Sequence, residues 1–191
     1  MKSSRILYII YMAIMLLVVG LIAITPLIAF QDEATSEIFY KLFSPACHQK
    51  LSRSLCLFQN ENAYFISDCT PQTGVFVPND SSILSSETDG TKGYKFPVCS
   101  RDVALYFAML LGGAVYPFIR KIEEKQMLPA IYFIAAISPI ALDGIVQLAS
   151  IIGMLPPYES TNLIRMVTGG LAGFAAAIYI IPIIMSLFSR D

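Results

Sequence analysis

Residues 6–30 read ILYIIYMAIMLLVVGLIAITPLIAF, a run without a single charged side chain. A helix needs about 20 apolar residues to cross the hydrocarbon core of a bilayer, so this run predicts a membrane-spanning helix. Lys2 and Arg5 precede it, as basic residues precede the apolar part of a signal peptide. The run is longer than the usual apolar region of about 7–15 residues, and no small-x-small cleavage site follows it. We therefore expect a retained helix.

The rest of the chain is also built for a bilayer. Of the 191 residues, 55% are hydrophobic and only 14% are charged, whereas a soluble domain has roughly 25% charged residues. The net charge is −1 and no basic cluster with interleaved aromatic residues is present, which excludes a nucleic-acid partner. Three further apolar stretches, at 103–119, 128–152 and 166–188, predict an all-α integral membrane protein with four transmembrane helices.

Positive charges in the short connections predict the orientation in the membrane. Basic residues cluster before the first span, directly after the second span and at the end of the chain. Four spans place these regions on one side, and the positive-inside rule makes that side the cytoplasm. We expect a multi-pass protein of the cell membrane with both termini cytoplasmic, divided into a first helix (1–30), an extracytoplasmic cap (31–102) and a three-helix portion (103–191).

The cap between the first two spans has two parts. Residues 36–44 carry apolar side chains at helical spacing and predict an amphipathic helix on the membrane surface, ended by a proline. The segment 56–95 is rich in turn residues around two short β-like runs, at 63–67 and 74–77, and predicts a small hairpin-like structure. Asn79 begins a triplet that fits the glycosylation pattern, a match that arises often by chance.

All four cysteines lie in the cap, where an outward location permits disulfides. Four cysteines allow three pairings. Cys56 and Cys69 flank the first β-like run and would close a short loop, so we expect them to form a structural disulfide. Cys47 and Cys99 then remain, both close to helix ends.

Cys47, His48, Cys99 and Asp102 are candidate ligands of a metal ion. Thiolate and imidazole groups are the ligands that zinc prefers, and a carboxylate can complete the set. The spacing is not that of a standard Cys-x-x-Cys site, and adjacent residues seldom bind the same ion. A disulfide between Cys47 and Cys99 is an equally good interpretation, so both remain open.

Asp143 lies about nine residues inside the third span, a depth of roughly 14 Å. An ionisable group at such a depth costs several kcal/mol unless it faces protein, water or a partner. Gln147 shares its helix face, and Arg165 and Arg101, near the outer ends of their helices, are its natural ion partners. We interpret Asp143, Gln147 and Arg165 as candidate catalytic residues, with the alternative that Asp143 and an arginine only hold the helices together. The candidate substrate-binding residues are Arg53, Arg101, Asn162 and Thr168.

The motifs CHQ, RS, PVCSRD, DGIVQ and STNLIRMVTGG together resemble those of a prokaryotic and archaeal family of small membrane proteins of unknown function. The resemblance runs from about residue 47 to residue 170 and implies a multi-span fold. It also implies that the insertion with Cys56 and Cys69 is peculiar to this chain, and that many relatives have cysteine where Asp102 stands. That difference weakens a four-ligand zinc site here.

Three functions compete. The first is a metal-dependent membrane enzyme or ligand-binding protein, with zinc as the expected cofactor and an anionic lipid or small molecule as ligand. The second is a thiol-disulfide oxidoreductase linked to a quinone, against which stands the missing Cys-x-x-Cys pair. The third is a transporter or a subunit of a membrane complex, with a protein partner or a second copy. Whether the chain is an enzyme stays open.

Overall fold

The computed structural model describes residues 2–60, 63–71, 84–88 and 90–188. Within them lie four helices that are long and apolar enough to cross a membrane. They are α1 (Lys2–Gln31), α3 (Ser100–Ile119), α4 (Ala130–Ile151) and α5 (Asn162–Phe188). The protein is thus mostly helical, and the four apolar spans expected from the sequence are confirmed.

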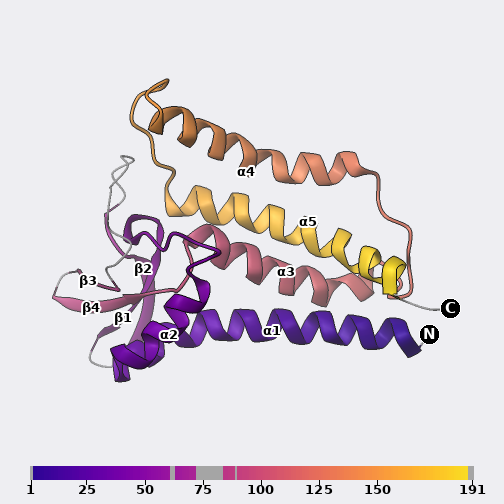
Figure 1. Ribbon diagram of the computed structural model, residues 1–191, viewed down its shortest axis with the longest axis horizontal. Helices are drawn as coiled ribbons and strands as arrows, with labels where there is room; N and C mark the ends of the chain where they lie inside the picture. The colour runs from indigo at the N-terminus through magenta and orange to yellow at the C-terminus, as the bar shows by residue number, and fades with distance from the viewer. Residues whose placement is uncertain (1, 61–62, 72–83, 89, 189–191) are drawn as a thin grey trace.

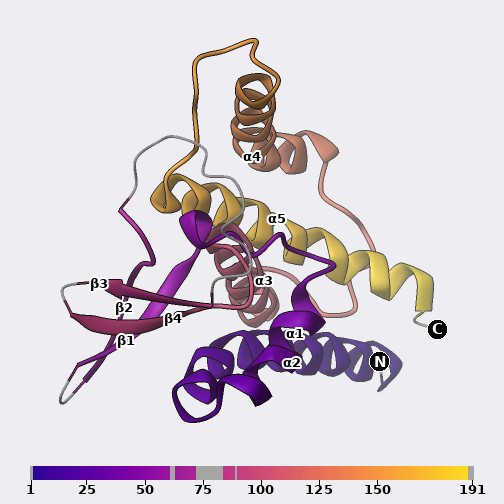
Figure 2. The same ribbon diagram turned by 60° about the vertical axis from the view of Figure 1, so that its left-hand side comes forward.

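The four long helices run roughly alongside one another, with the cap at one end (Figure 1). In the same view, the first residues of α1 and the last described turns of α5 lie at the opposite end. α3 and α5 make the most extensive contact, α1 packs against α3, and α4 packs against α5 on its outer side. Turning the molecule shows that α4 stands apart from α1 and α3 (Figure 2).

Two glycines of α5 allow α3 to come very close. A Cβ atom added to Gly169 would lie 2.3 Å from the carbonyl oxygen of Arg101, and one added to Gly173 would lie 2.1 Å from that of Leu105. Neither position has room for a larger side chain. The small-x-x-x-small pattern of these glycines therefore forms the face on which α3 and α5 meet.

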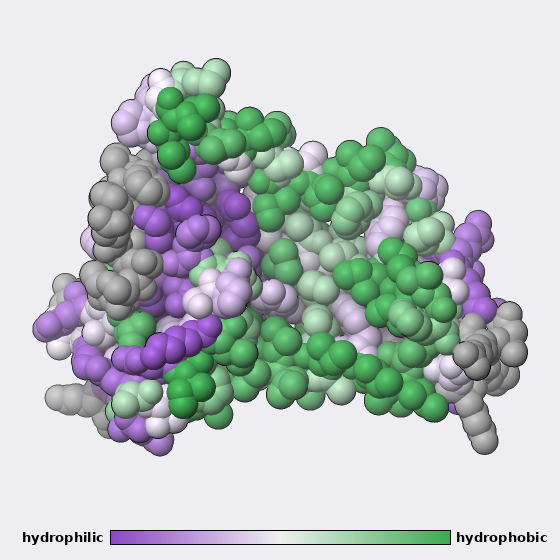
Figure 3. Space-filling view, in the orientation of Figure 1, coloured by the Kyte–Doolittle hydropathy of each residue, from purple (hydrophilic) through white to green (hydrophobic). Residues whose placement is uncertain are grey.

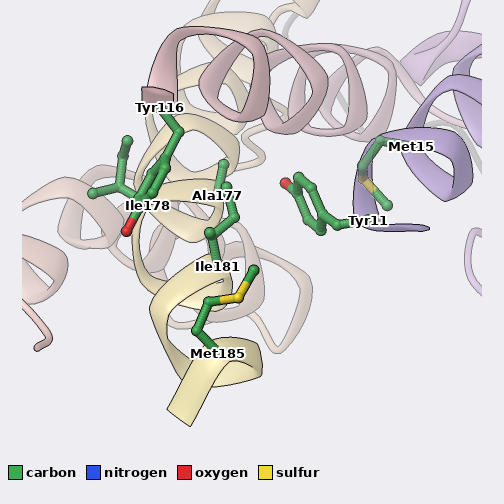
Figure 4. Packing of buried hydrophobic residues seen from close by; sticks show 7 residues of the cluster. All are labelled: Tyr11, Met15, Tyr116, Ala177, Ile178, Ile181 and Met185. Carbon is green, nitrogen blue, oxygen red and sulfur yellow. The ribbon is translucent and has the colours of Figure 1, made fainter. Parts of the chain in front are cut away.

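A cluster of apolar side chains fills the bundle toward the end away from the cap. Tyr116 of α3 and Ile181 of α5 are almost completely buried there, next to Tyr11 of α1 (Figure 4). The hydroxyl of Tyr11 donates a hydrogen bond of 3.0 Å to the carbonyl oxygen of Met109, and Tyr8 does the same at 2.9 Å to that of Gly113. These bonds tie α1 to the backbone of α3 inside the apolar region.

The amphipathic helix expected at 36–44 is present as α2 (Glu33–Phe43). Asp32 caps its first turn, because its carboxylate accepts a hydrogen bond of 3.0 Å from the amide of Ala34. Tyr40 and Phe43 face the protein, whereas Ile38 and Leu42 are largely exposed. This separation of faces fits a helix that lies on a membrane surface.

The cap also contains a four-stranded antiparallel sheet, so the expected all-α class is correct only for the membrane portion. Its spatial order is β2-β1-β4-β3. The strands are β1 (Leu55–Asn60), β2 (Ala63–Asp68), β3 (Ser85–Thr88) and β4 (Thr91–Lys95). The β-like run at 63–67 is therefore a strand, but its partner is β1; the expected partner at 74–77, like Asn79, lies outside the described residues.

A disulfide joins Cys56 of β1 to Cys69 at the end of β2, the pair expected from the sequence. Phe58 packs beside it and is completely buried. A Cβ atom at Gly93 of β4 would lie 2.4 Å from the ring of Phe58, so only glycine fits there. The sheet thus has its own small core.

The starts of α3 and α5 differ from those expected in a way that affects the candidate site. α3 begins at Ser100 rather than at 103, with Cys99 at the N-cap, so Asp102 lies in the first turn. α5 begins at Asn162 rather than at 166. Both helices therefore extend beyond their apolar runs, and the extra turns carry the polar side chains of the candidate site.

Candidate functional site

Cys47 and Cys99 meet at the junction of the cap and the membrane portion, although 52 residues separate them. Both thiols are free. The Cys47 sulfur accepts hydrogen bonds from the amides of Cys99, at 3.2 Å, and Gln49, at 3.4 Å. The carboxylate of Asp102 lies 3.1 Å from the Cys99 sulfur, and the ligand atoms of the three residues all lie within 4.8 Å of one another.

The two thiols differ in acidity. A hydrogen bond from the Cys99 thiol, assisted by the two backbone amides, lowers the pKa of Cys47 below its ordinary value although the residue is buried. The same bond, together with burial, raises the pKa of Cys99. Cys47 is therefore the more acidic of the two thiols.

Gln49 holds the loop that presents Cys47. Its backbone adopts a φ of 51°, a left-handed conformation that costs a residue other than glycine roughly 1–2 kcal/mol. Its side-chain amide donates hydrogen bonds to the carbonyl oxygens of Tyr40, at 2.6 Å, and Pro97, at 2.7 Å. The completely buried Lys95 donates to the carbonyl oxygen of Gln49 at 2.6 Å. These bonds connect α2, the loop and β4, which fixes the position of Cys47.

A pocket of about 190 Å³ opens beside the thiols. Four basic side chains line it, those of Lys50, Arg53, Arg101 and Arg165. The other side chains of chemical interest in its wall are Cys47, His48, Cys99, Asp102 and Gln147. Figure 3 shows hydrophilic residues gathered over this end of the molecule, in contrast to the apolar surface of the helices.

Asp143 lies behind this wall, where it holds Arg101. The two form a salt bridge between α4 and α3. The carboxylate of Asp143 also accepts hydrogen bonds from Ser160, at 3.0 Å, and Tyr158, at 3.1 Å, both in the loop that leads to α5. Gln147, one turn further along α4, reaches Ser160 at 3.3 Å. A buried charge inside the span is thus satisfied by partners from two segments, α3 and the loop before α5.

Glu159 connects two arginines of the pocket. It forms a salt bridge with Arg53 of the cap, and its Oε1 atom lies 3.9 Å from Nη2 of Arg165. The carboxylate is buried, and so is Arg165, which is 2% exposed. Arg165 also donates a hydrogen bond of 3.0 Å from Nε to the carbonyl oxygen of Ser160.

The remaining candidate residues lie outside the wall or at its edge. His48 borders the pocket, but its side chain is exposed and is not in the group formed by Cys47, Cys99 and Asp102. Asn162 binds Ser100 and Asp68, with bonds of 2.7 and 2.8 Å. It therefore joins α5 to α3 and the cap.

Thr168 also lies away from the pocket wall. Its hydroxyl donates to carbonyl oxygens of its own helix, those of Ile164, at 2.9 Å, and Arg165, at 3.2 Å. Neither Asn162 nor Thr168 is among the residues that line the pocket.

Glu159 and Lys50 were not among the residues singled out from the sequence. The sequence does contain a pattern that could have identified Glu159. It is an acidic residue in a short connection, six positions before Arg165 at the start of the fourth span. A buried arginine needs a nearby anion, so this pairing could have been anticipated. Lys50 follows the Cys-His-Gln motif directly, but its contribution to the pocket depends on how the loop folds.

Comparison with known proteins supports the expected family. Residues 88–179 match the model of a family described as "Predicted membrane protein (DUF2085)". The matched region contains Cys99, Asp143, Glu159 and Arg165, whereas Cys47 lies before it. The resemblance to an uncharacterised family of archaeal and prokaryotic membrane proteins is therefore confirmed.

A relative from Methanocaldococcus jannaschii, described as an uncharacterized protein, is 38% identical over 98 residues. The alignment covers 51% of this chain and 59% of that protein, so the chain spans less than two thirds of the relative's length. No solved structure matches the chain. These similarities establish a membrane protein of unknown function and assign no activity.

Proposed function

We propose that this protein is a metal-dependent membrane enzyme or ligand-binding protein, with a transition-metal ion bound by Cys47, Cys99 and Asp102. The observation that carries the proposal is the convergence of two free thiols and a carboxylate from distant segments within 4.8 Å. Zinc is the first candidate, because thiolate ligands favour it. Ligand atoms about 2.0–2.3 Å from a tetrahedral zinc lie about 3.3–3.8 Å apart, and the three ligand atoms here lie within 4.8 Å of one another, so small side-chain shifts would complete the site.

Three protein ligands suit a functional metal better than a structural one. Structural zinc sites have four protein ligands, whereas catalytic sites keep a position for water or substrate. Here that position would face the pocket, next to Gln147 and the arginines. His48 also lines the pocket. It does not belong to the group formed by Cys47, Cys99 and Asp102.

The test is elemental analysis of the detergent-purified full chain by mass spectrometry. We expect about one zinc per chain, and loss of zinc in the variants Cys99→Ser and Asp102→Asn. Glu37→Gln changes an exposed carboxylate on α2 and serves as the matched control, while His48→Gln should retain the metal. Wild-type protein that carries no metal after reconstitution with zinc would refute the proposal.

One observation favours a second function, thiol-disulfide exchange. Cys47 and Cys99 are free, adjacent and unequal in pKa, as in a pair with one nucleophilic and one resolving thiol. Oxidation would join the two sulfurs and release two protons and two electrons, which would reduce a quinone to its quinol. Mass analysis of alkylated protein before and after incubation with a soluble quinone tests this: two thiols lost together from Cys47 and Cys99 would support it.

A further inference from the structure

Arg165 has hydrogen-bonding capacity that the protein does not use. It is 2% exposed and lines the pocket. Its Nη2 atom is 3.9 Å from Glu159, which is too far for a hydrogen bond, and no other acceptor for it exists among the described residues. A buried donor left without an acceptor costs about 1–3 kcal/mol, and more when it is charged. Such an arrangement is typical of a site that awaits an anionic ligand.

Arg101, which also lines the pocket, has the same property. One of its terminal nitrogens is engaged by Asp143, whereas its buried Nε has no hydrogen-bond acceptor within the described part of the chain. Arg53 approaches from the cap, paired with Glu159. The three guanidinium groups therefore come from α3, α5 and the cap, and salt bridges hold each of them in place.

The charges of the pocket wall are strongly unbalanced. Four cations line it and Asp102 is the one carboxylate among its lining residues. Glu159 and Asp143 reduce the excess but stand behind the arginines, where they position them. The pocket has a volume of about 190 Å³. That space admits a small tetrahedral oxyanion and part of the molecule that carries it.

We propose that Arg53, Arg101 and Arg165 form a binding site for a phosphate group. Three guanidinium groups from separate elements suit a phosphate better than a carboxylate, because one arginine can already satisfy a carboxylate bidentately. This inference deepens the proposed function by naming the ligand class of the same pocket. It depends on the arginines and not on the thiols, so the two proposals can fail separately.

The phosphate can belong to a lipid headgroup or to a soluble molecule, and the experiment distinguishes them. The full chain is purified in detergent, and the shift of its thermal unfolding midpoint is measured with inorganic phosphate and with chloride at equal ionic strength. The same protein in nanodiscs of phosphatidylcholine is compared with nanodiscs that also contain phosphatidic acid. Stabilisation by inorganic phosphate indicates a soluble source; stabilisation by phosphatidic acid alone indicates a lipid headgroup.

Arg165→Lys keeps the charge but loses the planar fork, and we expect it to weaken phosphate binding roughly tenfold or more. Arg101→Lys should act in the same way, and it decides the question if Arg165→Lys does not fold. Arg120→Lys, outside the pocket, is the matched control. No stabilisation of the wild type by either phosphate source, or equal stabilisation of wild type and Arg→Lys variants, would overturn the inference.

The double variant Cys47→Ser/Cys99→Ser separates this site from the metal. Phosphate binding that persists without the thiols supports an arginine site that stands alone. Binding that is lost with the thiols but unchanged by Arg165→Lys and Arg101→Lys would show that the metal holds the phosphate, and would overturn the arginine site while leaving the metal proposal intact.

Discussion

Gly173→Ala tests how tightly the membrane helices are packed. Among the described glycines, Gly173 has the closest backbone neighbour, since its added Cβ would lie 2.1 Å from the carbonyl oxygen of Leu105. Ordinary contacts begin at 3.4 Å, so α3 and α5 would have to separate by about 1.3 Å. The neighbour is backbone and cannot rotate away. Overpacking of this kind costs about 1–3 kcal/mol.

Gly170→Ala is the matched control, because its added Cβ has nothing within 4 Å. Both substitutions replace glycine by alanine in the middle of α5, and both gain about 0.8–1 kcal/mol of helix propensity. The difference between them therefore isolates the steric cost. We expect Gly173→Ala to be less stable than Gly170→Ala by about 1–3 kcal/mol.

The assay is equilibrium unfolding of both variants and the wild type in the same detergent mixture, followed by circular dichroism. Gly170→Ala should unfold at or above the wild-type midpoint, and Gly173→Ala below it. Equal midpoints for the two variants would show that α3 and α5 do not meet at Gly173, and the helix packing described above would be wrong.

Three further predictions concern the polar end of the molecule. Asp143→Asn leaves Arg101 buried without its counter-ion, so we expect a loss of about 3–5 kcal/mol in detergent unfolding, and the apolar double variant Asp143→Leu/Arg101→Met should recover most of it. The hydrogen bond from Tyr94 lowers the pKa of Glu33; its contribution is thus complete above the ordinary value of 4.5 and is lost as the pH falls through the lower, folded value. Hydrogen exchange of α2 should increase there in the wild type, and Glu33→Gln should remove this dependence. Serine at both Cys56 and Cys69, which are 13 residues apart, should destabilise the cap by about 3 kcal/mol, measured by limited proteolysis, with the membrane helices unaffected.

The membrane helices could be predicted because the bilayer imposes a simple requirement. A long run without charges, such as residues 6–30, has few alternatives to a membrane-spanning helix. The helix ends were less certain, since α3 and α5 continue into polar turns at Ser100 and Asn162. Those turns are stabilised by tertiary contacts, such as the bond between Ser100 and Asn162, which no local pattern reveals.

The sheet of the cap was only partly predictable. β2 was recognisable from its β-branched and aromatic residues, but β1 is a short, continuously apolar run whose first four residues are buried. The first four residues lack the alternation of apolar and polar side chains that identifies a half-buried strand. Its pairing with both β2 and β4 depends on the contacts of Phe58 and on the disulfide at Cys56, and neither is encoded in a local sequence period.

Three of the four candidate metal ligands expected from the sequence come together, but the fourth does not. Cys47, Cys99 and Asp102 lie within 4.8 Å of one another, whereas His48 is exposed beside them. Adjacent side chains in an extended loop point in different directions, so the position of His48 could not be deduced from its neighbour. Of the two arginines expected as ion partners of Asp143, Arg101 forms the salt bridge, whereas Arg165 lies beside Glu159.

The salt bridges beside the pocket affect both the assembly of the helices and the position of the arginines. They attach α4 to the bundle, since Asp143 joins α4 to α3 and to the loop before α5. They also orient Arg53, Arg101 and Arg165, which line the pocket. Removal of an acidic partner such as Glu159 would therefore change helix assembly together with the phosphate binding proposed above. An Arg→Lys change keeps the charge for the acidic partner and removes only the planar fork, so binding can fall while assembly persists. Variants of this kind, and not charge deletions, reveal what the pocket binds.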